Sequence, residues 1–425
     1  MSRLTENIAE FAAQLPAPGR LSEQRAAAAD AFSASGLPAK TDERWRYTDL
    51  SALAQAQLQL ATAGASRAPD LDLLALDGDR IVFVDGQLDA SRTHVDAASG
   101  ISALAGDWSA LAEGFPRFSE VIAHPLGQLN TAASQHGVHV RTREGSAASE
   151  PLHIVLAHSS EAPAVLQPRI VIELAPHSTA NIVLQYIGDS QSTAWSNAVI
   201  EILQHEGSRL DYLQLQEQST AQTHTALISA ALDRDASATI ATFDLGAKLA
   251  RTDIDVALNG RGSSVSVFGA FLPIDAQHID THVCIDHAAA DSNSTTWFRG
   301  MAGERCRGVF NSKVIVRPDS QRISAEQRSD NLLLAEHAEI DTKPELEIYA
   351  DDVRCSHGAT VGELDEQHLF YLQSRGIDER AARALLTFAF ARTAVEHIDD
   401  ETLRELIAAR IARRLPEHER WERLN

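Results

Sequence analysis

The sequence predicts a mainly β protein with helical ends. From Pro151 onward, short apolar runs are broken every 10 to 20 residues or so by Gly, Asp, Asn and Ser, and helical patterning is almost absent for roughly 200 residues. Near both ends of the chain, apolar residues recur at helical spacing instead. We therefore expect an N-terminal helical region over 1–80, a β core over 81–362 and a C-terminal helical domain over 363–425.

The β core is expected to begin with a strand at Ile81–Val84 that runs into a turn at Asp85-Gly86, and to include a short helix over Leu126–Ala133. A sandwich and a coiled solenoid both fit the apolar runs that follow. We favour the solenoid because the series is long and monotonous and because stacked coils bury one continuous core. No strict repeat is visible, and the turns are not the two-residue Asn-Gly type typical of hairpins. The expected strands lie at Leu152–Leu156, Arg169–Leu174, Ala180–Tyr186, Ala198–Leu203, Arg209–Leu215, Thr225–Leu232 and Thr239–Leu245.

At the N-terminal end, an apolar stripe predicts a helix over residues 4–15, and an alanine-rich run ending at Phe32 predicts a second. Glu43–Thr48 (ERWRYT) then places two aromatic residues among charges, and we expect them to cover a seam between layers.

At the C-terminal end, Leu369 and Leu372 indicate a short helix that stops at Gly376. Asp378 is expected to cap a longer helix, and Asp399 or Asp400 a third. This tail could dock a partner, seal the end of the β block, or do both.

Composition excludes several classes of partner. The 425 residues carry a formal net charge of −22, which argues against binding to nucleic acid or to an anionic membrane. The three cysteines, at 284, 306 and 355, are too few for a disulfide framework and are expected to be free thiols in a reducing cytosol. The first residues lack the pattern of a secretory signal, and no apolar run is long enough to span a membrane. We therefore expect a soluble cytoplasmic protein.

The stretch Asp352–Gly362 (DVRCSHGATVG) holds Cys355 and, two residues on, His357. In a strand these side chains point to the same face, and thiolate and imidazole both suit iron, zinc or Cu(I). Gly358 and Gly362 suit tight turns or the close approach of another backbone. Two ligands do not complete a four-coordinate site. If the pair binds metal, the other ligands come from elsewhere in this chain or from a second chain.

A second candidate is the run His278–His287 (HIDTHVCIDH). Read as a strand, it puts His278, Asp280 and His282 on one face, where they could hold non-haem iron in a metal-dependent enzyme. The alternative, which we favour, is a solvated strand face whose polar groups bond along a ladder.

No nucleotide-binding or catalytic motif is apparent. Gly260 and Gly262 fit neither the dinucleotide fingerprint nor the P-loop, and are expected in a loop between strands. Hydrolase, metalloprotease and paired-cysteine motifs are also absent.

Long segments of the chain resemble the SufB/SufD family of iron–sulfur cluster assembly proteins. The resemblance is specific and covers nearly the whole chain, and Cys-Ser-His-Gly at 355–358 is similar to the SufD branch rather than the SufB branch. Asn311–Lys313 (NSK) departs mildly from the family, where a glycine is frequent. The segments that carry the resemblance are Glu43–Thr48, Leu129–Ala132, Arg299–Gly300, Val309–Lys313, Ala325–Leu334, Ala338–Ile348, Ala350–Gly362, Leu369–Leu372 and Ser374–Ile377.

The resemblance implies a right-handed parallel β-helix between the two helical regions, which favours the solenoid over the sandwich. It also implies a non-enzymatic scaffold in a complex with SufB, bound at the end of the β-helix, and with the SufC ATPase, bound at the C-terminal helices. The sequence leaves open whether the chain forms a homodimer without SufB. Cys355 and His357 would then lie at the SufB interface and take part in nascent cluster assembly and iron acquisition. A transient iron–sulfur cluster or iron would be shared with SufB, and SufC would hydrolyse the ATP.

Overall fold

The computed structural model describes residues 12, 15, 20–56, 58–61, 71–96, 100–107, 121, 123–148, 150–160, 162–188 and 193–415. The helix expected over residues 4–15 lies largely outside these residues. The N-terminal part contains α2 (Arg20–Ser35), the 3-10 helix η1 (Glu43–Trp45), α3 (Ser51–Gln55) and the short strand β1 (Gln59–Leu60). The predicted internal helix is present as α6 (Pro125–Ala133), which packs its leucines and alanines against α2.

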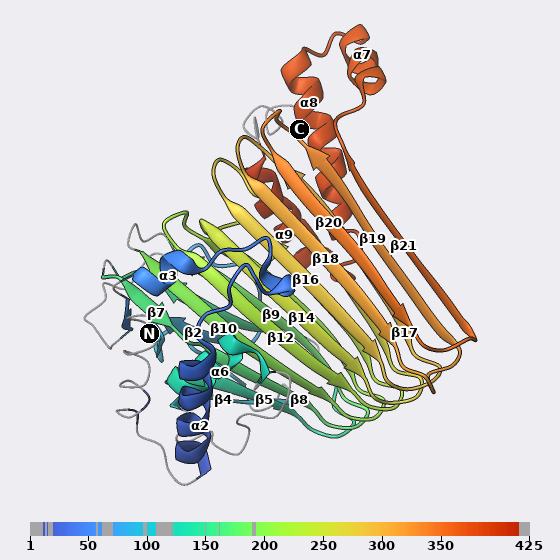
Figure 1. Ribbon diagram of the computed structural model, residues 1–425. Helices are drawn as coiled ribbons and strands as arrows, with labels where there is room; N and C mark the ends of the chain where they lie inside the picture. Colours follow the sequence, from blue (N-terminus) through green and yellow to red (C-terminus); the bar gives the residue numbers. More distant parts are fainter. Residues whose placement is uncertain are drawn as a thin grey trace.

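The centre of the molecule is a parallel β-helix built from two facing sheets (Figure 1). One sheet follows the order β20-β18-β16-β14-β12-β10-β8-β5-β4, and the other the order β21-β19-β17-β15-β13-β11-β9-β6-β2-β3. From β8 onward, consecutive strands therefore belong to opposite sheets, and each coil contributes one strand to each sheet. This arrangement confirms the solenoid and excludes the sandwich.

The first strands of the core are β2 (Arg80–Val84), β3 (Gln87–Leu88), β4 (Ile101–Asp107), β5 (His136–Thr142), β6 (Leu152–His158) and β7 (Ala164–Leu166). The coils that follow consist of β8 (Arg169–Leu174), β9 (Thr179–Gly188), β10 (Ala194–Gln204), β11 (Arg209–Gln218), β12 (Thr223–Leu232), β13 (Ser237–Asp244), β14 (Leu249–Leu258), β15 (Ser264–Phe271), β16 (His278–His287), β17 (Asn293–Ala302), β18 (Arg307–Val316), β19 (Ile323–Leu333), β20 (Glu339–Ile348) and β21 (Val353–Gly362). All seven expected strands between 152 and 245 are present, most of them longer by a few residues.

Coils of unequal length explain why the sequence shows no strict repeat. Ile228 pairs with Ile254, 26 positions on, whereas Ser312 pairs with Pro344, 32 positions on. The register nevertheless stacks like residues: Ile170, Ile200 and Ile228 lie side by side in neighbouring coils and are buried inside the β-helix. β-branched side chains pack well on such pleated surfaces.

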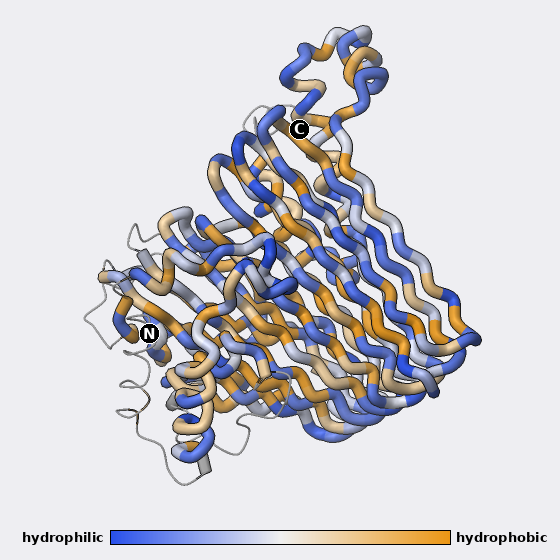
Figure 2. The backbone as a smooth tube through the Cα atoms, viewed as in Figure 1, coloured by the Kyte–Doolittle hydropathy of each residue, from blue (hydrophilic) through white to orange (hydrophobic). Residues whose placement is uncertain are grey.

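The corners on one side of the β-helix also stack. His177, Asp235 and Asp291 adopt the left-handed backbone conformation, and each donates its N–H to a carbonyl of the next coil. Figure 2 shows hydrophobic residues along the strands and hydrophilic ones at many of these corners. Polar and left-handed turn residues thus end each strand without breaking the stack.

The C-terminal helices are α7 (Glu366–Ser374), α8 (Glu379–Arg392), the 3-10 helix η3 (Thr393–Val395) and α9 (Glu401–Arg414). The predicted caps are present: Asp378 accepts from the N–H of Ala381, and Asp400, not Asp399, accepts from that of Leu403. Ile407 and Ile411 of α9 belong to a buried cluster on the outer face of the second sheet, together with Phe243. In Figure 1, α7 lies beyond this contact. The tail therefore seals the sheet with α9 and leaves α7 projecting. Within the described chain, no helix is both long and apolar enough to cross a membrane.

Candidate functional site at the end of the β-helix

Cys355 and His357 lie on β21, the outermost strand of the second sheet (Figure 1). Within the described part of the chain, β21 pairs with β19 on one side only, and β20 likewise pairs with β18 on one side only. The outer edges of both strands therefore present backbone N–H and C=O groups to any chain that can add a strand. Pro344 lies within β20, which fits the confinement of proline to edge strands.

The register turns both side chains toward the interior of the β-helix. Cys355 pairs with Ala325 and His357 with Gln327, and both partners are buried in the preceding coil. Cys355 itself is partly buried against the apolar core, whereas His357 is exposed. The last coil thus ends in a face that carries a half-covered thiol beside an open imidazole.

Burial raises the pKa of the Cys355 thiol, which favours its protonated form near neutral pH. Beneath His357, Gln327 accepts from the Ser312 hydroxyl and donates to the carbonyl of Glu345 at 3.1 Å. A Cβ added at Gly358 or Gly362 would meet no atom within 4 Å, which leaves room for another backbone to approach. Within the described residues, no group of three His, Cys, Asp or Glu side chains could hold a metal ion.

The run His278–His287 forms β16 as predicted, with Ile279, Val283 and Ile285 in the core. The prediction of a solvated polar face is wrong for Asp280 and His282, which are buried, whereas His278, Cys284 and Asp286 are partly exposed. Asp280 is fully buried, with Arg251 of β14 at 2.7 Å and His282 at 2.9 Å.

Asp280 and His282 are buried because the Glu43–Thr48 segment covers this part of the face. The Thr48 hydroxyl donates to Asp280 and lies 2.8 Å from Nε2 of His278, while the Trp45 ring stacks on the Arg251 guanidinium at 3.8 Å. Arg44 pairs with Asp255 at 3.1 Å. These contacts confirm that the aromatic segment covers a seam.

Charge pairing dominates this covered face. Burial opposes the ionisation of Asp280, but His282, Arg251 and the bond from Thr48 together lower the pKa of its carboxyl. Burial also lowers the pKa of His278, which keeps its ring neutral. Since the Asp280 oxygens are committed to a cation, a ring and a hydroxyl, the geometry favours a structural role for His278, Asp280 and His282. Arg251 was missed at the sequence level because its partner Asp280 lies 29 positions away.

Other predicted features fall outside the site. Gly260 and Gly262 lie in the loop between β14 and β15, as expected. Cys284 and Cys306 are free thiols, as is Cys355. On α7, the side chains of Phe370 and Tyr371 are 72% and 56% exposed.

Residues 155–390 match the family model described as SUF system FeS cluster assembly, SufBD core domain. The chain belongs to this family. It is 31% identical over 389 residues to the iron-sulfur cluster assembly protein SufD of Escherichia coli (strain K12), and the alignment covers 90% of each chain. Identity is 29% to an iron-sulfur cluster assembly SufBD family protein of Synechocystis sp., over 89% of this chain and 87% of the relative. It is 25% to the chloroplastic protein ABCI7 of Arabidopsis thaliana, over 90% and 83%.

The family model spans β6 to α8, so the SufBD core includes the terminal coil with Cys355 and His357. The chain is thus a SufD-type member of the family, as the resemblance in the sequence predicts. The parallel β-helix that the resemblance implies is also present.

Proposed function

We propose that this chain is a non-enzymatic scaffold subunit for iron–sulfur cluster assembly, which works in the cytosol with a SufB-type and a SufC-type partner. The observation that carries the proposal is an incomplete ligand set at an open end: Cys355 and His357 share the inner face of β21, whose outer edge is unpaired within the described chain. A SufB-type subunit that adds strands to β20 and β21 would cover this face and supply further ligands. Iron and sulfide are the substrates of the site, held transiently between the two subunits.

The chemistry of the two side chains supports this assignment. Thiolate sulfur is the usual ligand of iron in clusters, and neutral imidazole can replace it. Because burial raises the pKa of the Cys355 thiol, the free subunit would bind metal weakly near neutral pH. Docking of a partner beside the exposed His357 would complete the shell and favour the thiolate.

The helix α7 supports a second contact. The exposed Phe370 and Tyr371 form an aromatic surface on a helix that projects from the β-helix, and we propose it as the docking surface for the SufC-type ATPase. Motion driven by ATP hydrolysis would then reach the terminal coil through the short link between β21 and α7.

Substitution of the ligand pair tests the cluster role. Cys355→Ala and His357→Ala are each expected to co-purify with both partners yet to lose cluster formation in cells, measured by iron and acid-labile sulfide in the purified complex. Ser356→Ala is the matched control, because Ser356 is exposed on the same strand between the two ligands. Wild-type cluster content in both variants would refute the ligand role.

The docking role of α7 is tested separately. The double variant Phe370→Ala/Tyr371→Ala is expected to lose the SufC-type subunit in co-purification while it retains the SufB-type subunit. His368→Ala, at an exposed position on the same helix, is the control. Retention of both partners by the double variant would place the ATPase contact elsewhere.

A further inference from the structure

The interior of the β-helix is not uniformly apolar. In the coils from β9 to β14, its inner face carries Gln214, His224, Thr242 and Asp244, together with Tyr186, among the aliphatic residues. All are at most 1% exposed. Polar groups buried this deeply are costly unless each finds a hydrogen-bond partner.

Several of these groups have none within the described residues. The orphaned atoms are Oη of Tyr186, Nε2 of Gln214, both amide atoms of Gln222, both ring nitrogens of His224 and Oγ1 of Thr242. The rings of Tyr186 and His224 are in edge contact at 4.5 Å between centroids, and Tyr212 donates to Oε1 of Gln214 at 3.1 Å. Gln214 also pairs directly with Thr242 on the next coil, and Gln222 lies two residues before His224. These groups therefore belong to one stretch of neighbouring coils.

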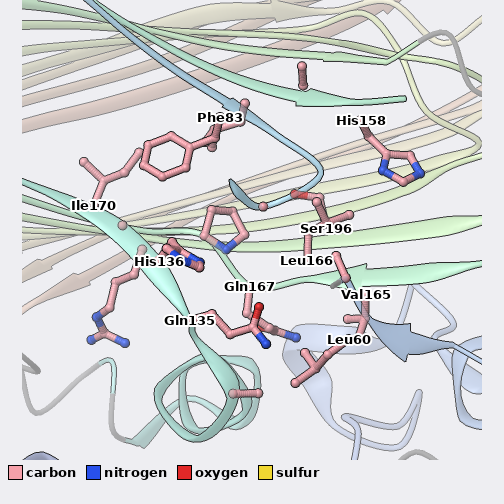
Figure 3. Close-up of a pocket in the computed structure, with 18 of the residues that line it drawn as sticks. Leu60, Phe83, Gln135, His136, His158, Val165, Leu166, Gln167, Ile170 and Ser196 are labelled. Atoms are coloured by element: carbon pink, nitrogen blue, oxygen red, sulfur yellow. The ribbon is translucent and has the colours of Figure 1, made fainter. Parts of the chain in front are cut away.

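A cavity of about 40 Å³ adjoins this stretch at the N-terminal end of the β-helix. Figure 3 shows Phe83 and Ile170 on one side of it, and Gln135 and Gln167 on another. Ser196, which also lines the cavity, pairs directly with His224 on the next coil. Nε2 of Gln167 is likewise buried without a partner in the described chain. A volume of this size holds roughly two or three water molecules.

At its other end the polar stretch meets three phenylalanines. In neighbouring coils, Asp244 is followed by Phe271, and Thr281 by Phe310. Phe298 packs against Phe310 at 4.6 Å between ring centroids, and all three rings are fully buried or nearly so. These three rings, named here the aromatic plug, lie in the coils between the polar stretch and the strand of Cys355 and His357.

We propose that the lumen between the cavity and the aromatic plug binds a chain of ordered water molecules, which bridge Gln222, His224, Gln214 and Thr242. Water both donates and accepts, as this set of amide, imidazole and hydroxyl groups requires. Burial lowers the pKa of His224 to about 3, so its ring is neutral and offers one donor and one acceptor. The phenylalanines end this row of water molecules, so no water reaches the thiol end of the β-helix from this side.

Crystallography of the full chain tests the proposal. A map at high resolution should show ordered waters within hydrogen-bonding distance of His224, Gln222 and Thr242. Water-oxygen magnetic relaxation dispersion should detect them in solution as long-lived waters. A map in which the orphaned atoms bond to one another in other rotamers, with no water between them, would overturn it.

A variant gives an independent readout. His224→Leu should remove at least one long-lived water from the dispersion signal. The control is His287→Leu: His287 is as deeply buried, but both its ring nitrogens lie 2.8 Å from serine hydroxyls, those of Ser292 and Ser294. Equal numbers of long-lived waters in His224→Leu and wild type would refute the proposed chain of waters. If His224→Leu does not fold, the wild-type map and the wild-type dispersion signal decide.

Discussion

Asp244 gives a prediction that links the interior of the β-helix to the pH dependence of stability. Asp244 is 1% exposed, and within the described residues its carboxyl accepts two long bonds, from Thr252 at 3.4 Å and Thr281 at 3.3 Å. Burial raises its pKa from 3.8 to about 7. Burial and the Asp244 carboxyl both raise the pKa of the Tyr186 and Tyr212 hydroxyls, so they stay neutral.

The direction of the effect follows from proton release. Between pH 4 and pH 7, roughly, Asp244 is protonated in the folded protein and ionised in the unfolded chain, so unfolding releases a proton and stability falls as the pH rises. Below this window both states are protonated, and above it both are ionised. The interval from 3.8 to about 7, at 1.36 kcal/mol per pH unit, makes the loss at most about 4 kcal/mol.

Asp244→Asn replaces the carboxyl by a neutral amide of the same size, so its contribution does not vary with pH. The free energy of unfolding, measured by urea titration, should exceed wild type by only about 1 kcal/mol at pH 4.5. At pH 8 it should exceed wild type by up to about 4 kcal/mol. Asp235→Asn is the control, because Asp235 is exposed and asparagine tolerates its left-handed backbone. A mutant-minus-wild-type difference that is the same at both pH values would refute the reasoning.

Two further substitutions test the covered face and the C-terminal helices. Arg251→Met leaves Asp253 and Asp280 buried without the guanidinium that pairs with both. It should lower the free energy of unfolding at pH 7 by roughly 3–5 kcal/mol. A loss below about 1 kcal/mol would show that the carboxylates find other partners. Asp400→Ala removes the cap of α9 and should cost about 1 kcal/mol, whereas Asp399→Ala should be nearly neutral, and equal losses would contradict the assignment of the cap.

The sequence alone determined the types of the secondary-structure elements. Strand alternation placed β16 at His278–His287 with its ends correct, and an aspartate before an apolar stripe placed the start of α8. These signals are local: side-chain direction alternates along a strand, and a cap lies within one turn of the helix it begins. The run around Cys355 likewise carried the family resemblance, which the SufBD core match bears out.

Tertiary structure decided which of these residues meet. In a parallel β-helix each side chain contacts its counterpart one coil away, and coils of 26 to 32 residues hide that spacing from any short window. The sequence pattern therefore indicated a solvated Asp280, although Arg251 of the preceding coil and Thr48 of a distant segment bury it. The same stacking turned Cys355 and His357 inward on a strand whose outer edge is unpaired within the described residues. The sequence supplied the ligand types, but only the order of the strands placed them at the end of the stack, because a strand's neighbours depend on the whole chain.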